Sequence, residues 1–224
     1  MHIGLIGGIG PAATEVYYRA LVRAFADAGR RLRLTIVHAD AAELIANLEA
    51  GRNAEQAAIF ARFIDQLRAG GCDIAAVTSM GGHFCIKELE AVSSLPLANA
   101  VAALDAYFAA RGVKRIGVMG TRAVMESRLY GLSSVDVVAP PPVELVSVHQ
   151  AYVTIAKAGW ASPEHCAYFR AVGLALHRDQ GADIVVLGGT DLSLAFGADD
   201  PGYPIVDSAL IHADAIARTA MAAG

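Results

Sequence analysis

The chain has 224 residues, which is enough for one large domain or two small ones. Hydrophobic residues make up 55% of it and charged residues 18%, yet no uninterrupted apolar stretch reaches the roughly 18 residues that a membrane-spanning helix needs. The formal net charge is −4, from 18 basic and 22 acidic residues. The basic side chains form no cluster, so the sequence predicts neither a nucleic acid nor a membrane as partner.

The start of the chain and its cysteines indicate a cytoplasmic protein. Residues 2–6 already read as a strand, without the basic and then apolar segments of a secretory signal. Cys72, Cys85 and Cys166 lack the spacing of a disulfide framework and are expected to be reduced thiols. The histidines are scattered without ligand spacing, so no metal site is predicted.

Short apolar runs alternate with longer helical patterns along the whole chain. After a first strand at residues 4–6, a helical pattern from Thr14 onward places Tyr17, Leu21 and Phe25 on one stripe. This alternation predicts an α/β fold with parallel strands and helices on both faces. Further strands are expected at residues 32–37, 73–77, 115–119, 135–138 and 183–187, and a closing helix from residue 208.

Two helix starts have recognisable sequence signals. Asn53 is expected to cap a helix, with Gln56 three residues later completing a capping box. Ser162 is expected to cap another helix, with Pro163 in its first turn.

The chain also repeats itself loosely. The segment GLIG at residues 4–7 resembles GVMG at 117–120, and GCDIAAV at 71–77 resembles GADIVVL at 181–187. The matched pairs are separated by nearly equal distances, which favours two copies of one unit. The alternative is that such strand ends recur in any α/β protein. A crossover near Pro96 divides the chain into residues 1–96 plus 208–224 and residues 97–207.

Ligands of open parallel sheets bind beyond the carboxyl ends of the strands. We therefore expect two facing lobes with a cleft between them, where backbone N–H groups bind a carboxylate or phosphate. The glycines before Pro11 lack the dinucleotide-binding spacing, and proline removes an N–H from that loop, so no nucleotide cofactor is predicted. The segments expected at the site are residues 7–14, 78–83, 120–127 and 188–193.

Six short motifs are spread along essentially the whole chain. They are GGIGPAAT at 7–14, VMGT at 118–121, MES at 125–127 with Tyr130, IAKAG at 155–159, LGGTDL at 187–192 and PIVDS at 204–208. In this order they resemble the amino-acid racemase branch of the aspartate/glutamate racemase superfamily. The resemblance implies two pseudo-symmetric lobes, each a mainly parallel sheet flanked by helices.

The resemblance implies a homodimer that inverts an α-carbon without a cofactor, using two cysteines with a pKa of about 8.5 as acid and base. Those two positions fall on Ser79 and Gly189, so both thiols are absent. The residues that follow the first cysteine are also replaced, by Met80 and Gly81. General acid–base groups contribute about 10²–10⁴-fold each, so ordinary racemisation should be reduced severely.

Other side chains are candidates for the missing roles. Asp191 could act as a carboxylate base or cap a helix start. His83 could protonate or orient a substrate, or be structural, whereas Cys85 fits better as a small core residue. His38 and Asp40 either reach the site or belong to a polar loop. Residues implied to hold a small carboxylate or amino-acid ligand are Gly8, Thr14, Thr78, Gly81, Thr121, Lys157 and Thr190, although Lys157 also suits a solvated helix end.

Four explanations stay open at this point. The first is an aspartate/glutamate-type racemase-like isomerase with an altered acid–base set drawn from Ser79, Thr78, His83 and Asp191. The second is a lyase, decarboxylase or isomerase of another small carboxylate, for which Gly189 would enlarge the pocket. The third is a non-catalytic carboxylate-binding protein. The fourth is laboratory replacement of one or both cysteines to trap a ligand.

Overall fold

Two compact units make up the protein in the computed structural model, which describes residues 1–197 and 200–223. The first unit comprises Met1–Ala100 with His212–Gly224, and the second comprises Val101–Ile211. Each unit contains one parallel sheet flanked by helices, which confirms the predicted α/β class. Within the described residues, no helix has the length and apolar character needed to cross a membrane.

The first sheet has the strand order β2-β1-β3. Its central strand β1 (Ile3–Gly7) is buried along its whole length and pairs in parallel with β2 (Leu34–His38) and β3 (Ile74–Val77). The register pairs Gly7 with His38, so these strands end at the same edge of the sheet. We call this edge, with the loops that follow its strands, the first carboxyl edge.

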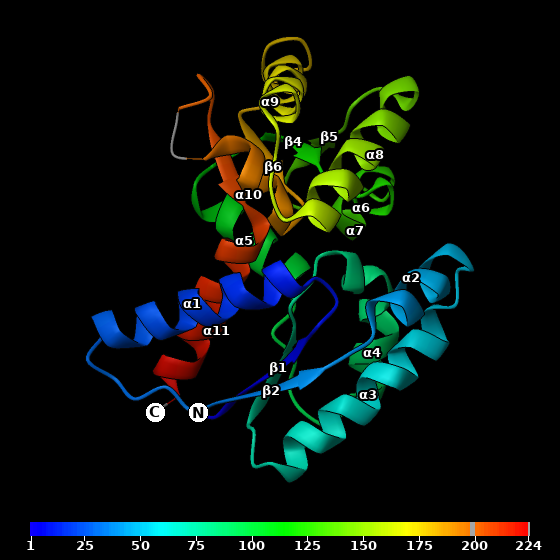
Figure 1. The fold of residues 1–224 in the computed structure, drawn as a ribbon. Helices are drawn as coiled ribbons and strands as arrows, with labels where there is room; N and C mark the ends of the chain where they lie inside the picture. The colour runs from blue at the N-terminus through cyan, green and yellow to red at the C-terminus, as the bar shows by residue number, and fades with distance from the viewer. Residues whose placement is uncertain (198–199, 224) are drawn as a thin grey trace. The chain divides into compact units, whose positions relative to one another are not determined.

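Helices cover both faces of the first sheet (Figure 1). On one side lie α1 (Pro11–Asp27) and α11 (Ser208–Ala222), and on the other lie α3 (Asn53–Ala69) and α4 (Ile86–Val92), with α2 (Ala41–Glu49) beside α3. The predicted stripe of α1 is buried against the core, because residues four apart share a helix face. Its members are Tyr17, Leu21 and Phe25.

The second sheet has the order β5-β4-β6-β7, again with every pair parallel. Its strands are β4 (Arg115–Met119), β5 (Asp136–Val138), β6 (Ile184–Leu187) and β7 (Ile205–Asp207). We call the end of this sheet after Met119, Leu187 and Asp207 the second carboxyl edge. The helices of this unit are α5 (Ala100–Ala110), α6 (Arg122–Glu126), α7 (Arg128–Gly131), α8 (Pro142–Ala158), α9 (Pro163–Arg178) and α10 (Ser193–Phe196).

Each unit has its own hydrophobic core. In the first, Phe60 and Ile64 of α3 pack with Ile6 of β1. In the second, Phe169 and Leu176 of α9 belong to the cluster that includes the strand ends Met119 and Leu187. Two short 3₁₀ helices, η1 (Gly81–Cys85) and η2 (Thr190–Leu192), follow β3 and β6.

One of the two predicted helix caps is wrong. Asn53 is the first residue of α3, and Arg52 precedes it without a side-chain cap. Gln56 is buried and accepts a hydrogen bond from Asn47 Nδ2 at 2.9 Å. A buried side-chain amide requires such a partner, so Gln56 is not available to cap the start of the helix. Asn53 instead donates to the carbonyl of Phe84.

The other cap is confirmed. Ser162 Oγ accepts a hydrogen bond from His165 N at 3.3 Å, and Pro163 occupies the first position of α9.

Candidate functional site

The loops after β1 and β3 are joined by threonine hydroxyls at the first carboxyl edge. Thr14 Oγ1 accepts a hydrogen bond from Gly8 N at 3.0 Å and donates to Gly10 O at 3.3 Å. Thr78 Oγ1 donates to Ile6 O at 3.0 Å and lies 3.5 Å from Thr14 Oγ1. The structure therefore brings the predicted residues Gly8, Thr14 and Thr78 together. Both threonine hydroxyls donate their hydrogens to backbone carbonyls.

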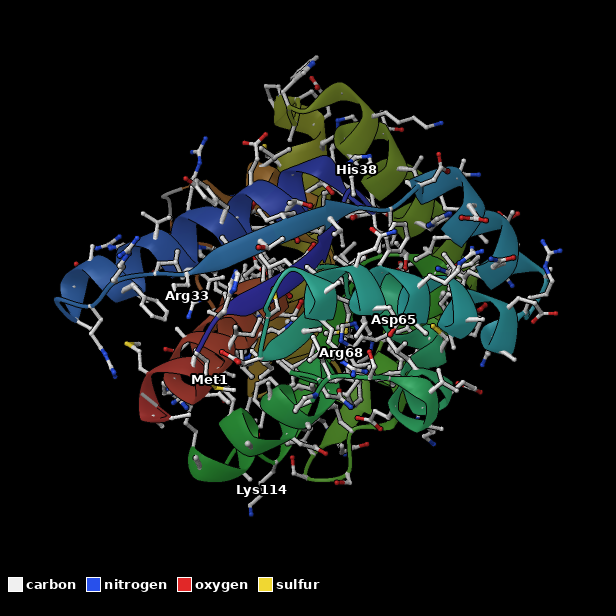
Figure 2. The ribbon with its side chains drawn as sticks, turned by 90° about the horizontal axis from the view of Figure 1, so that it is seen from below. Met1, Arg33, His38, Asp65, Arg68 and Lys114 are labelled. Carbon is white, nitrogen blue, oxygen red and sulfur yellow. The ribbon has the colours of Figure 1, made fainter. Side chains whose placement is uncertain are left out.

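Gly8 also contacts the end of β2. Its φ is +87°, and an added Cβ would lie 2.5 Å from Ala39 O and 2.6 Å from His38 Nδ1, so a side chain is excluded there. Figure 2 shows His38 where β2 ends. Asp40 caps α2, because its Oδ1 accepts from Glu43 N at 2.8 Å.

His83 is tied to the backbone on both sides of its ring. Ala100 N donates to His83 Nε2 at 3.2 Å, so Nδ1 carries the proton and donates to Ser79 O at 2.7 Å. The side chain is buried, and this burial lowers the pKa of His83 to about 4. His83 thus holds the backbone of Ser79 in place, while the Ser79 side chain is half-buried beside Gly81.

A second buried histidine, which the sequence reasoning missed, extends this support. Tyr17 OH donates to His212 Nδ1 at 2.8 Å, and His212 Nε2 donates to Ala98 O at 2.8 Å. Burial, together with His83, lowers the pKa of His212 to about 3. The two rings meet edge to face at 5.7 Å between centroids. His212 therefore links α1 to Ala98, and its ring packs against His83, which binds the backbone of Ser79.

The buried cysteines of the first unit are not placed as acid–base groups. Cys85 is fully buried, and its Sγ points to Gly82 O at 3.6 Å. Burial raises the pKa of Cys85 to about 12 and also raises that of Cys72. This placement suits the expected role of Cys85 as a small core residue.

At the second carboxyl edge, Asp191 and Thr190 are buried in η2. Asp191 Oδ2 accepts a hydrogen bond from Tyr152 OH of α8 at 3.0 Å. No side-chain cap is formed at the start of η2, so Asp191 occupies the edge as a carboxylate paired with a phenol. Thr190 O accepts a hydrogen bond from Ser193 Oγ at 2.7 Å.

The space beside Gly189 is filled. An added Cβ would lie 2.5 Å from Cε2 and 2.8 Å from the hydroxyl of Tyr152. The expectation that Gly189 enlarges a pocket is therefore wrong, because the ring of Tyr152 occupies that volume. Tyr152 carries no motif signal, since its place depends on how α8 packs against η2.

Asp207 adds a second buried carboxyl to this edge. It ends β7 and pairs in register with Leu187 of β6. Its Oδ1 accepts a hydrogen bond from Ala209 N at 2.8 Å, which caps the start of α11. Burial raises the pKa of Asp207 to about 6, and the charge of Asp191 contributes in the same direction. The same two carboxyls, with burial as the main cause, raise the pKa of Tyr152 above its ordinary range.

Thr121 and Lys157 have ordinary helix-end positions. Thr121 Oγ1 accepts from Val124 N at 3.4 Å and so caps α6. Lys157 is exposed in the last turn of α8, where a cation complements the helix dipole.

The model of the Asp/Glu/Hydantoin racemase family matches residues 6–216 of this chain. A candidate Asp/Glu racemase from Yersinia pestis is 26% identical and covers 99% of this chain and 100% of its own, with a TM-score of 0.87. An aspartate racemase homologue from Pyrococcus horikoshii OT3 is 22% identical over 98% of this chain and 99% of its own, with a TM-score of 0.80. An aspartate racemase from Picrophilus torridus is 21% identical over 99% and 95%, with a TM-score of 0.74. The last two likenesses show the fold alone.

Proposed function

Because the chain belongs to the Asp/Glu/Hydantoin racemase family, we propose that it is a cofactor-independent isomerase that inverts the α-carbon of an aspartate- or glutamate-type amino acid. The observation that carries this proposal is the family match over nearly the whole chain. Both sheets also end in loops bearing polar side chains, where parallel sheets bind their ligands.

This proposal names one proton-transfer residue in each unit. In the second unit the group is Asp191, a carboxylate in a largely buried position. In the first unit it is Ser79, whose hydroxyl can protonate an α-carbanion because such a carbanion is a far stronger base than an alkoxide. Ser79 and Gly189 stand, in this proposal, where the family has its two cysteines.

An amino-acid ligand fits the charge of the second carboxyl edge. Asp191 and Asp207 are both buried there, and a substrate ammonium group would offset their mutual repulsion. A dicarboxylate without an ammonium group would add to that repulsion. The ring of Tyr152 also fills the space that a bulkier lyase substrate would need at Gly189. Thr121 and Lys157 are proposed to attract the ligand carboxylates.

A two-step experiment tests the proposal. Thermal shift with D- and L-aspartate, D- and L-glutamate, smaller amino acids, malonate and maleate identifies the ligand. A ligand present at ten times its dissociation constant stabilises the folded state by roughly 1.4 kcal/mol, which is measurable. Chiral chromatography of the stabilising amino acid, incubated with protein and no added cofactor, should then show the opposite enantiomer. Stabilisation by malonate or maleate alone, with no inversion of any amino acid, contradicts the proposal.

A further inference from the structure

We propose that Tyr152 is a positioning residue that orients the Asp191 carboxylate. In this proposal Asp191 is the proton acceptor of the second carboxyl edge. The ring of Tyr152 lies where a side chain at residue 189 would otherwise be. This inference rests on the proposed isomerase function and names a residue of the same site. Three observations on Tyr152 support it: its hydrogen bond, its location and its protonation state.

The first observation is the hydrogen bond from Tyr152 OH to Asp191 Oδ2 at 3.0 Å. The donor sits on α8 and the acceptor on η2, so the bond joins two separate elements. Asp191 is 8% exposed, and a carboxylate held this far inside by a neutral donor has few orientations available. Its Oδ2 atom is fixed toward the phenol, which leaves Oδ1 as the oxygen to receive a proton.

The second observation is the location of the ring. The backbone of Gly189 is extended, with φ −151° and ψ 128°, so any residue type could adopt it. What excludes a side chain there is the Tyr152 ring, at 2.5 to 2.8 Å from an added Cβ. The phenol of Tyr152 thus fills the space that a side chain at residue 189 would occupy.

The third point is that a raised pKa keeps the phenol of Tyr152 protonated near neutral pH. Burial is the main cause that raises the pKa of Tyr152, and the carboxyls of Asp191 and Asp207 raise it further. The hydroxyl is therefore a hydrogen-bond donor throughout and a poor proton source. Tyr152 acts through Asp191 rather than on the substrate itself.

The proton-transfer step balances with groups already named. The α-C–H bond of the substrate breaks, the proton forms an O–H bond with Asp191 Oδ1, and the electron pair stays on the α-carbon. A proton donor on the opposite face then gives its proton to the α-carbon, which forms the new C–H bond, and proton exchange with solvent restores Asp191 and that donor. Tyr152 keeps its own proton throughout, and its hydrogen bond keeps the acceptor oxygen aligned.

The test is a double-mutant cycle on the steady-state rate of inversion. Tyr152→Phe removes the hydroxyl and keeps the ring, so kcat should fall on the order of 10- to 100-fold while KM changes little. Asp191→Asn removes the acceptor and should lower kcat by about 10²–10⁴-fold. If Tyr152 acts through Asp191, the double variant should be no slower than Asp191→Asn alone.

The matched control is Tyr168→Phe in the same unit. The Tyr168 hydroxyl is buried and has no hydrogen-bond partner among the described residues, so its removal should leave kcat unchanged. Equal rates for Tyr152→Phe and Tyr168→Phe, or additive losses in the double variant, overturn the role of Tyr152 and leave the proposed function standing. If the unmutated protein inverts no amino acid, both proposals fall together.

Discussion

The backbone angles of Gly189 suit any residue type. The loss of folding stability caused by a side chain at this position therefore depends on its contact with the ring of Tyr152. Gly189→Ala places a methyl group 2.5 Å from Tyr152 Cε2, a separation that real atoms do not tolerate. The ring must shift, and overpacking of this kind typically costs about 1–3 kcal/mol. We expect urea denaturation of Gly189→Ala to show a loss of unfolding free energy in that range.

The same substitution made in a Tyr152→Ala background provides the control. With the ring removed, the three atoms nearest to the new methyl group are gone, so its cost should shrink to a few tenths of a kcal/mol. An equal cost in both backgrounds would mean that the ring does not fill this space, and the pairing of Tyr152 with Gly189 would be refuted.

The site could be predicted from the sequence only as far as its loops. Residues in the loops that follow buried strands are placed by the strand ends, as are Thr78 directly after β3 and Asp191 in the short 3₁₀ helix after β6. Tyr152 and His212 could not be found in this way, because each comes from a helix far along the chain. Their positions depend on the packing of α8 and α11, which no local pattern encodes.

Among the helices, α7 is unusual, because three consecutive non-glycine residues adopt left-handed backbone angles. Arg128, Leu129 and Tyr130 have φ values of 51°, 56° and 59°. Such a conformation costs L-residues roughly 1–2 kcal/mol each relative to a right-handed turn. Glycine carries no such penalty, so replacing the exposed Arg128 should relieve strain at this turn.

Arg128→Gly is therefore expected to leave the free energy of unfolding unchanged or to raise it by up to about 1 kcal/mol. The matched control is Arg62→Gly, an exposed arginine inside the right-handed helix α3, which should lose about 1 kcal/mol. Chemical denaturation of both variants compares them directly. A loss at Arg128 as large as that at Arg62 would show that the left-handed turn is unstrained.

The predicted strands are confirmed to within a residue or two, because a buried parallel strand is a continuous apolar run between turn residues. Several elements were not predicted, and β7 and α2 show why. The strand β7 has three residues, too few for a pattern, and α2 follows β2 after a loop that offered only a capping aspartate, Asp40. The failed capping box at Asn53 has a tertiary cause, since Gln56 is drawn into the core by Asn47.

For the whole molecule, buried ionisable groups predict how stability varies with pH. Burial lowers the pKa of His83 and His212 from 6.5 to about 4 and about 3. Below pH 6.5 the unfolded chain therefore binds protons that the folded protein does not, and the free energy of unfolding falls as pH falls. Asp207 opposes this, because its pKa is raised from 3.8 to about 6 and its folded form takes up a proton in that interval.

With two histidines against one aspartate, the net loss between pH 6 and pH 4 is roughly 1 kcal/mol per pH unit. Urea denaturation at pH 7, 6 and 5 measures it. In a His83→Asn variant one histidine remains against one aspartate, so the slope in this interval should become nearly flat. A slope in the unmutated protein that is flat or rises toward acid would contradict the placement of the two histidines as buried neutral rings.

The most direct test of the isomerase account is deuterium incorporation at the α-carbon. Aspartate and glutamate of both configurations are incubated in D₂O with the protein and no added cofactor, and the α-proton signal is followed by NMR. The account predicts that this signal disappears for one of these amino acids, and that Asp191→Asn slows the loss by about 10²–10⁴-fold. A signal that persists for all four compounds at high protein concentration would contradict it.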